Sequence, residues 1–207
     1  RGRAVQNLMF EGKEKRLALI DELLLVNDIR TLPKEEEEKF LVNQQSDFDQ
    51  KGKPDNLFDG GIGYGSTWAH SDLSNTHLAM EALYYAKKKL KKKEEDQADL
   101  DWEAAIQFVS KCQNLPSSNP QDWVSSHPED QGGFVYFPGH SMAEDRVDEN
   151  GSKSLRSYGS MSYAGLLSFI YAEMDASDPR VLAVHDWLNQ NYQIDENPGM
   201  GKQGLFY

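Results

Sequence analysis

The chain of 207 residues carries a formal net charge of −12 and is 38% hydrophobic and 27% charged. This length and balance are typical of one globular domain with a core, and they exclude a disordered chain. The acidic charge disfavours a nucleic-acid partner, because phosphate binding requires a basic face and the basic run at residues 87–93 is followed directly by acidic residues.

Helical periodicity and capping residues predict six helices in chain order. They cover residues 13–27, 33–45, 74–92, 101–113, 158–173 and 179–192, with loops over 46–72, 114–157 and 193–207. Pro33, followed by acidic residues, suits the first turn of a helix, and Asp178 with Pro179 suits a cap and first position.

The predicted helix at 158–173 is apolar almost all round. Its apolar residues include Met161, Tyr163, Leu166, Leu167, Phe169 and Ile170. A helix that is apolar on every side is typical of a buried position, so we expect this helix to be covered on both sides.

The single cysteine, the apolar runs and the chain ends limit the protein further. Cys112 excludes an internal disulfide but leaves the compartment open. No apolar run approaches the roughly 20 residues of a membrane-spanning helix, which leaves only peripheral contact with a membrane open. The chain begins at Arg1 without a signal peptide and ends at Tyr207 in a glycine–aromatic cluster, so we expect a fragment.

A glycine-rich motif recurs at a nearly constant interval. The sequences DGGIGYG, QGGFVY and KQGLFY align Gly61, Gly133 and Gly204, which are 72 and then 71 residues apart. This interval predicts a repeat, and we expect a backbone role with positive φ for Gly133.

The segment before each glycine cluster also recurs. An aromatic–aliphatic pair is followed, five positions after the aromatic, by Gln45, by Gln113 and, in the third copy, by Tyr192. Each unit of about 72 residues is therefore a helix, a glycine-rich loop and a more apolar helix. This alternation predicts an all-α fold in which helix pairs form an α/α barrel, or toroid, with an open solenoid as the alternative. A closed barrel needs more helices than these, so we expect an incomplete part of one.

The order of these motifs resembles the repeat of squalene cyclases, of protein prenyltransferase β subunits and of squalene-cyclase-like proteins with prenyltransferase and squalene oxidase repeats. The resemblance is carried by KFLVNQQ with DGGIGYG, DLSNTHLAMEAL, AIQFVSKCQN with GGFVYFPG, LRSYGSMSYAGLLSFIYA and DENPGMGKQGLFY. It treats residues 1–207 as one domain, of which 1–38 match weakly. It implies a terpenoid-cyclase toroid whose inner helices line an apolar cavity that accepts isoprenoid chains.

The motifs that carry catalysis in this family do not occur in the chain. Neither the Asp-x-Asp-Asp acid motif nor the Asp-Asp-x-x-Asp motif that binds diphosphate through magnesium is found. Ser157 and Gly159 stand where the Asp and Cys zinc ligands of the prenyltransferases would be. We therefore expect no metal and no cofactor, and no catalytic residue is assigned.

Loops at one end of a toroid gather at the mouth of the cavity, so polar residues that precede inner helices are candidates for ligand contact. These are Asp72, His140, Arg156 and Tyr158, with Tyr163 as an aromatic of the lining. The alternative for the first four is a capping or loop-surface role, and for the aromatics it is core packing.

Two functions follow from the resemblance. The first is cyclase or isomerase action on an isoprenoid such as a triterpene, and the second is a non-catalytic toroid that holds a lipid, an isoprenoid or a protein partner. A carbohydrate-active α/α barrel is a third alternative, which would require paired carboxylates at the barrel mouth.

Overall fold

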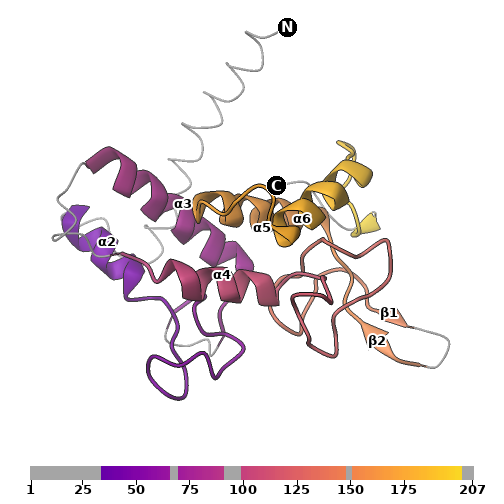
Figure 1. The fold of residues 1–207 in the computed structure, drawn as a ribbon, viewed down its shortest axis with the longest axis horizontal. Helices are drawn as coiled ribbons and strands as arrows, with labels where there is room; N and C mark the ends of the chain where they lie inside the picture. Colours follow the sequence, from indigo (N-terminus) through magenta and orange to yellow (C-terminus); the bar gives the residue numbers. More distant parts are fainter. Residues whose placement is uncertain (1–33, 66–69, 91–98, 148–150, 202–207) are drawn as a thin grey trace, which may run out of the picture.

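A computed structural model describes residues 34–65, 70–90, 99–147 and 151–201 (Figure 1). Within these ranges the helices are α2 (Lys34–Val42), α3 (Leu73–Leu90), α4 (Trp102–Lys111), α5 (Gly159–Tyr171) and α6 (Pro179–Gln190). Two short strands, β1 (Arg146–Val147) and β2 (Lys153–Ser154), pair antiparallel. The helix expected at 13–27 and the glycine cluster expected at 202–207 lie outside the described residues.

Most of the regular structure is helical, and each described helix lies within a few residues of its predicted position. Asp178 caps α6 by accepting from the Arg180 amide at 2.9 Å, and Pro179 occupies the first turn, as predicted. The small sheet differs from the all-α expectation, because it forms inside the predicted loop at 114–157. Gly151 precedes β2 with φ of +82°, a conformation that a residue with a side chain rarely adopts. The toroid stays a prediction.

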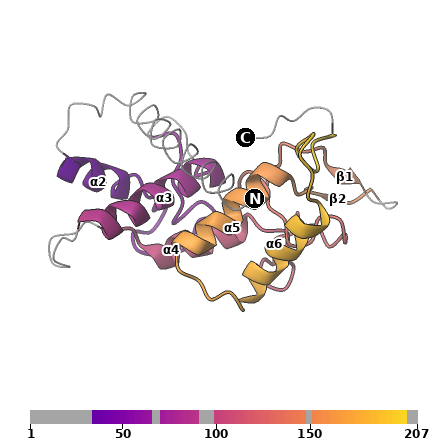
Figure 2. The same cartoon turned by 90° about the horizontal axis from the view of Figure 1, so that it is seen from above.

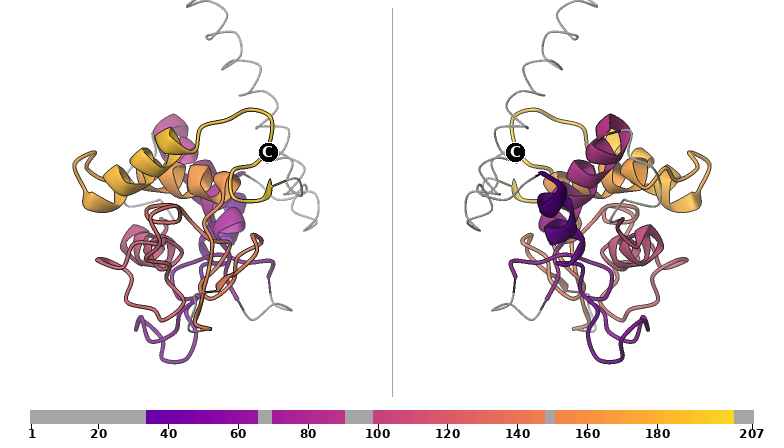
Figure 3. Two further views of the ribbon diagram at one scale, coloured as in Figure 1. Left: turned by 90° about the vertical axis from the view of Figure 1, so that its right-hand side faces the viewer. Right: turned by 90° about the vertical axis from the view of Figure 1, so that its left-hand side faces the viewer.

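Helix α5 has a central position among the helices. It packs against α3, α4 and α6, while α2 packs against α3. Figure 2 shows α5 between α3 and α6. In Figure 3 the long loops that follow α2 and α4 both lie below α3, α5 and α6. None of the described helices is both long and apolar enough to cross a membrane.

The expected burial of α5 on all sides is only partly observed. Met161 and Phe169 are buried, and the Phe169 ring lies edge-on to the buried Phe134 ring at 5.7 Å. Ile170, however, is 49% exposed, and Tyr163 is half-buried. The helices that pack against α5 therefore leave one side of it partly open.

In both units a hydroxyl group on the second helix makes the same two hydrogen bonds. The Thr76 hydroxyl on α3 donates to the carbonyl of Asp72 at 2.7 Å and accepts from the Ile62 amide at 2.9 Å. On α5 the Ser162 hydroxyl repeats both bonds, at 2.8 and 3.0 Å, with residues of its own unit. These partners are Tyr158 and Phe134. The predicted repeat is therefore present in the hydrogen bonds, and the second helices of the two units correspond at an offset of 86 residues.

Glutamine side chains tie the helices that open successive units. Gln45 and Gln113 each donate to the carbonyl of a loop glycine at 3.0 Å and to a backbone carbonyl at the start of the next opening helix at 2.9 Å. The carbonyls at the next helix belong to Asp101 before α4 and to Arg180 in α6. The paired glutamines found in the sequence thus have one structural role.

The two glycines of the second cluster are required for different reasons. Gly132 has φ of +95°, and a Cβ there would lie 2.3 Å from the Ala183 carbonyl oxygen of α6. Gly133 is not in the left-handed region, so the expected positive φ at Gly133 is wrong. A Cβ at Gly133 would instead lie 2.5 Å from the Ser157 Cβ, so this glycine is required by close packing.

Candidate functional site

A tight turn shapes the loop of the second unit. The Phe137 carbonyl accepts from the His140 amide at 2.9 Å, and Gly139 has φ of +88° after Pro138. Proline followed by a glycine with positive φ is the pattern of a type II turn. The turn brings the His140 ring back onto the Phe137 ring, where the two stack with centroids 4.8 Å apart.

Aromatic side chains from the loops of both units meet at this turn. The Phe137 ring stacks on His70 of the first unit at 4.5 Å as well as on His140, and it lies edge-on to Phe58 at 6.1 Å. His140 is exposed, while Phe58, His70 and Phe137 are half-buried. Because stacked and edge-on rings attract one another beyond the effect of burial, these contacts join the two loops into one surface.

Tyr136 lies at the centre of this surface. Its hydroxyl is 3.4 Å from the Tyr64 hydroxyl, its ring lies 6.4 Å from the His140 ring, and its carbonyl accepts from the Leu73 amide at the start of α3 at 2.9 Å. Burial raises the pKa of the Tyr136 phenol, and the bond to Tyr64 and the nearby Asp72 raise it further. Tyr136 is therefore a neutral phenol at physiological pH.

We call this group the Tyr136 cluster. Its members are Phe58, Tyr64, His70, Tyr136, Phe137 and His140.

Asp72 lies beside the cluster but serves to cap α3. One carboxylate oxygen accepts from the Asn75 amide at 2.9 Å, and the other accepts from the Asn75 side chain at 2.7 Å. Burial raises the pKa of this carboxyl, although the bonds from Asn75 and the neighbouring His70 oppose the rise. Both oxygens are thus engaged within the fold, as the capping alternative predicts.

The remaining predicted site residues are Tyr158, Arg156 and Tyr163. Tyr158 is buried before α5, and its amide donates to the Phe134 carbonyl at 3.2 Å. The Arg156 carbonyl accepts from the Ser141 hydroxyl at 2.7 Å, a bond that ties its backbone to the loop of the second unit. Tyr163 lies on α5, where burial first and nearby Tyr192 second raise its pKa.

The prediction did not include the aromatic residues that form most of the cluster. A signal for one pair was available: Tyr64 and Tyr136 occupy the same position of the repeated motif, 72 residues apart. Equivalent positions of neighbouring repeat units lie side by side in a stacked architecture. The contact between the two hydroxyl groups follows from that rule.

The described residues hold no group of three or more His, Cys, Asp or Glu side chains that could bind a metal ion. Cys112 is buried at the end of α4, and burial raises the pKa of its thiol well above the usual value. A thiol in that state is a poor nucleophile and a poor metal ligand. The cluster therefore offers aromatic faces, phenol groups and imidazoles.

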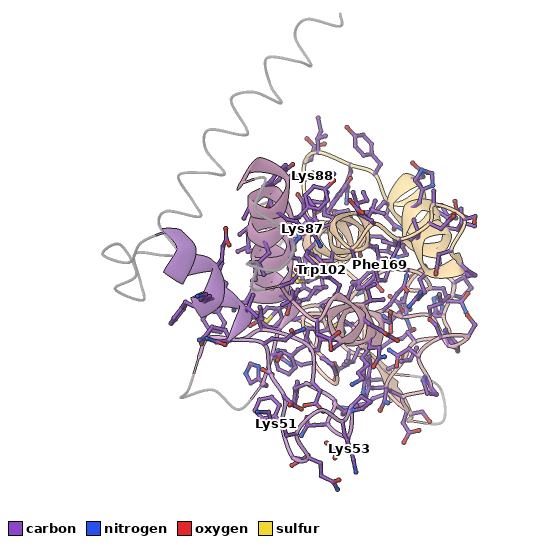
Figure 4. All side chains as sticks on the ribbon, turned by 60° about the vertical axis from the view of Figure 1, so that its left-hand side comes forward. Lys51, Lys53, Lys87, Lys88, Trp102 and Phe169 are labelled. Atoms are coloured by element: carbon purple, nitrogen blue, oxygen red, sulfur yellow. The ribbon has the colours of Figure 1, made fainter. Side chains whose placement is uncertain are left out.

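The four lysines labelled in Figure 4 do not form one basic patch. Lys51 and Lys53 lie at the opposite end of this view from Lys87 and Lys88. Lys87 also pairs with Asp99 at 2.9 Å, and Lys88 pairs with Glu173 at 3.6 Å. Their charge is thus partly neutralised.

The sequence matches no known protein-family model. Comparisons with curated proteins and with solved structures found no significant similarity. The resemblance to squalene-cyclase-like repeats therefore depends on the sequence motifs given above.

Proposed function

We propose that the chain is a squalene-cyclase-like helical-repeat protein that binds an apolar, isoprenoid-like molecule at the Tyr136 cluster. The observation that carries the proposal is the meeting of aromatic rings from two successive units around Phe137, where His140 is exposed and the other rings are half-buried. Aromatic faces supply apolar contact area together with π electrons, which suit the alkene groups of an isoprenoid chain.

Binding is favoured over catalysis by the state of Asp72. A cyclase must protonate an alkene or an epoxide with a carboxylic acid that is free to reach it. The Asp72 oxygens both accept hydrogen bonds from Asn75, which holds the carboxyl against the start of α3.

A cyclase or isomerase is the second candidate, and one observation favours it. Burial raises the pKa of Asp72, so this carboxyl keeps its proton to a higher pH than an exposed one. It lies close enough to Tyr136 to raise the pKa of that phenol too. A buried acid beside aromatic rings is the type of group that could protonate an isoprenoid.

Native mass spectrometry after incubation with a lipid extract, followed by incubation with squalene, separates the two candidates. Retention of an unchanged isoprenoid supports binding. Formation of a cyclised product that is lost in Asp72→Asn supports catalysis. If the protein neither retains nor converts an isoprenoid, both candidates are wrong.

Variants test whether the ligand lies at the cluster. His140→Ala removes an exposed ring that stacks on Phe137, so we expect affinity to fall by about fivefold. Met142→Ala is the matched control, because Met142 is exposed on the same loop and lies outside the cluster. Equal effects of the two substitutions would contradict the proposed position.

A further inference from the structure

Because the two units are repeats, the exposed side of α5 corresponds to the side of α3 that contacts α5. Thr76 on α3 and Ser162 on α5 make the same bonds, so a residue of α3 corresponds to the residue of α5 that follows it by 86 positions. With this offset, each residue of α3 that contacts α5 can be matched to an equivalent residue of α5.

Helix α3 holds α5 through rings that surround Tyr171. The centroid of the Tyr171 ring lies 5.3 Å from Tyr84, 5.8 Å from His77 and 6.0 Å from Tyr85. Tyr171 is buried in this contact.

The same positions on α5 form a more apolar surface. The offset of 86 places Tyr163 at the position of His77 and Ile170 at the position of Tyr84. It also replaces a charged residue by an apolar one, since Leu167 corresponds to Glu81. We call these three residues, Tyr163, Leu167 and Ile170, the α5 face.

The α5 face is partly open to solvent. Ile170 is 49% exposed, and the other two members are half-buried. An interface core is depleted in charge and enriched in aromatic residues, and this face has no charged residue and one tyrosine.

The chain also carries the complementary half of the contact. Tyr85 on α3 occupies the position of Tyr171 on α5, and it is 39% exposed. One copy therefore presents two complementary surfaces. The α5 face corresponds to the surface of α3 that contacts Tyr171, and Tyr85 on α3 corresponds to Tyr171 itself.

We propose that a second copy of this chain docks α3, with its Tyr85 at the position of Tyr171, onto the α5 face of the first copy. The contact is head-to-tail, because one subunit uses α5 and the other uses α3. A head-to-tail contact leaves one face of each type unpaired in a dimer, so assembly continues into a ring or an open array. The net charge of −12 opposes this association, and salt strengthens it by screening.

Sedimentation equilibrium of the full chain at about 1 to 100 µM tests the proposal. We expect the apparent mass to rise with protein concentration and with salt. A mass that stays monomeric over this range, at low and at high salt, overturns the proposal.

A matched pair of substitutions locates the contact. Ile170→Glu places a charge on the α5 face and should weaken association at least about tenfold. Leu182→Glu is the control, since Leu182 is 48% exposed on α6, outside the face. Association that survives Ile170→Glu, or that Leu182→Glu weakens equally, overturns the proposed surface. Circular dichroism confirms that each variant is folded.

Mixing two variants tests the head-to-tail order. Ile170→Glu retains the α3 surface and Tyr85→Glu retains the α5 face, so each alone should be monomeric while the mixture forms dimers and nothing larger. A mixture that stays monomeric overturns the order. If Tyr85→Glu fails to fold, Tyr85→Ala replaces it in the same experiment.

Discussion

At the scale of single residues, Asp72 combines a cap with a buried charge. Burial raises the pKa of this carboxyl above its value of 3.8 in an unfolded chain. The folded state therefore binds more protons than the unfolded state between the two pKa values. Asp72 contributes most stability below this window, and that contribution is lost as the pH rises through the folded pKa.

Asp72→Asn removes the titration while keeping a side-chain oxygen for the Asn75 amide. We expect the difference in unfolding free energy, native protein minus variant, to increase as the pH falls from about 7 to about 4. Urea unfolding at several pH values measures this difference. A difference that is constant or that decreases toward low pH would show that the Asp72 pKa is not raised.

Gly132 illustrates a residue fixed by two constraints at once. Gly132→Ala combines a strained positive φ with a Cβ only 2.3 Å from the Ala183 carbonyl oxygen, so it should cost more than about 3 kcal/mol. Gly52→Ala is the control, because Gly52 has φ of +74° with nothing within 4 Å of the added Cβ. That variant should cost only about 1–2 kcal/mol. Equal losses in urea unfolding would mean that the close approach to α6 contributes nothing.

At the scale of elements, an ion pair with a buried carboxylate joins the small sheet to the loop of the second unit. Arg146 in β1 donates to Asp130 at 2.8 Å, and the Asp130 side chain is only 2% exposed. This bond raises the pKa of Arg146, and the Ser125 hydroxyl also donates to the carboxylate at 2.9 Å. Removal of the guanidinium would leave a buried carboxylate without its countercharge.

Arg146→Met should therefore cost about 3 kcal/mol of unfolding free energy. Lys153→Met in β2 is the control, since Lys153 is 69% exposed and lies 3.7 Å from Asp145. An exposed pair of this kind contributes less than about 1 kcal/mol. Thermal or urea unfolding measures the loss of unfolding free energy in each variant. Similar losses in the two variants would contradict the role of the ion pair.

At the scale of the whole molecule, the glutamine side chains determine how the units are joined. Gln113 is fully buried and donates to Gly132 and to Arg180, whereas Gln45 is only half-buried. Without the donor, the Gly132 carbonyl would lose its Gln113 partner at a buried position, while the carbonyls near Gln45 would be hydrated more readily.

Gln113→Met should thus cost about 1–3 kcal/mol, and Gln45→Met should cost less than about 1 kcal/mol. Hydrogen exchange adds a local measurement, because the loss of the tie should increase exchange in the first turn of α6 after Gln113→Met. Stability losses in the reverse order would mean that burial does not decide the strength of these ties.

The prediction from sequence worked best where the determinant is local. Pro179 and Asp178 specify the start of α6 through a fixed φ and a capping oxygen, and neither depends on distant residues. The repeat was also predictable, because Gly61 and Gly133 are spaced by one unit and both lie in close contact with a serine.

Other features depend on contacts that a sequence does not display. The sequence by itself determined the helical units, the recurring glutamines and the spacing of the glycine clusters, because caps, helical periodicity and spacing act along the chain. Only the tertiary structure decided that Phe137 stacks between units, that Asp72 caps a helix and that Ile170 stays exposed on an apolar helix. The physical reason is that burial and ring contacts depend on which element packs against a helix. Helix α3 packs against α5, whereas no described helix takes the corresponding place beside α5.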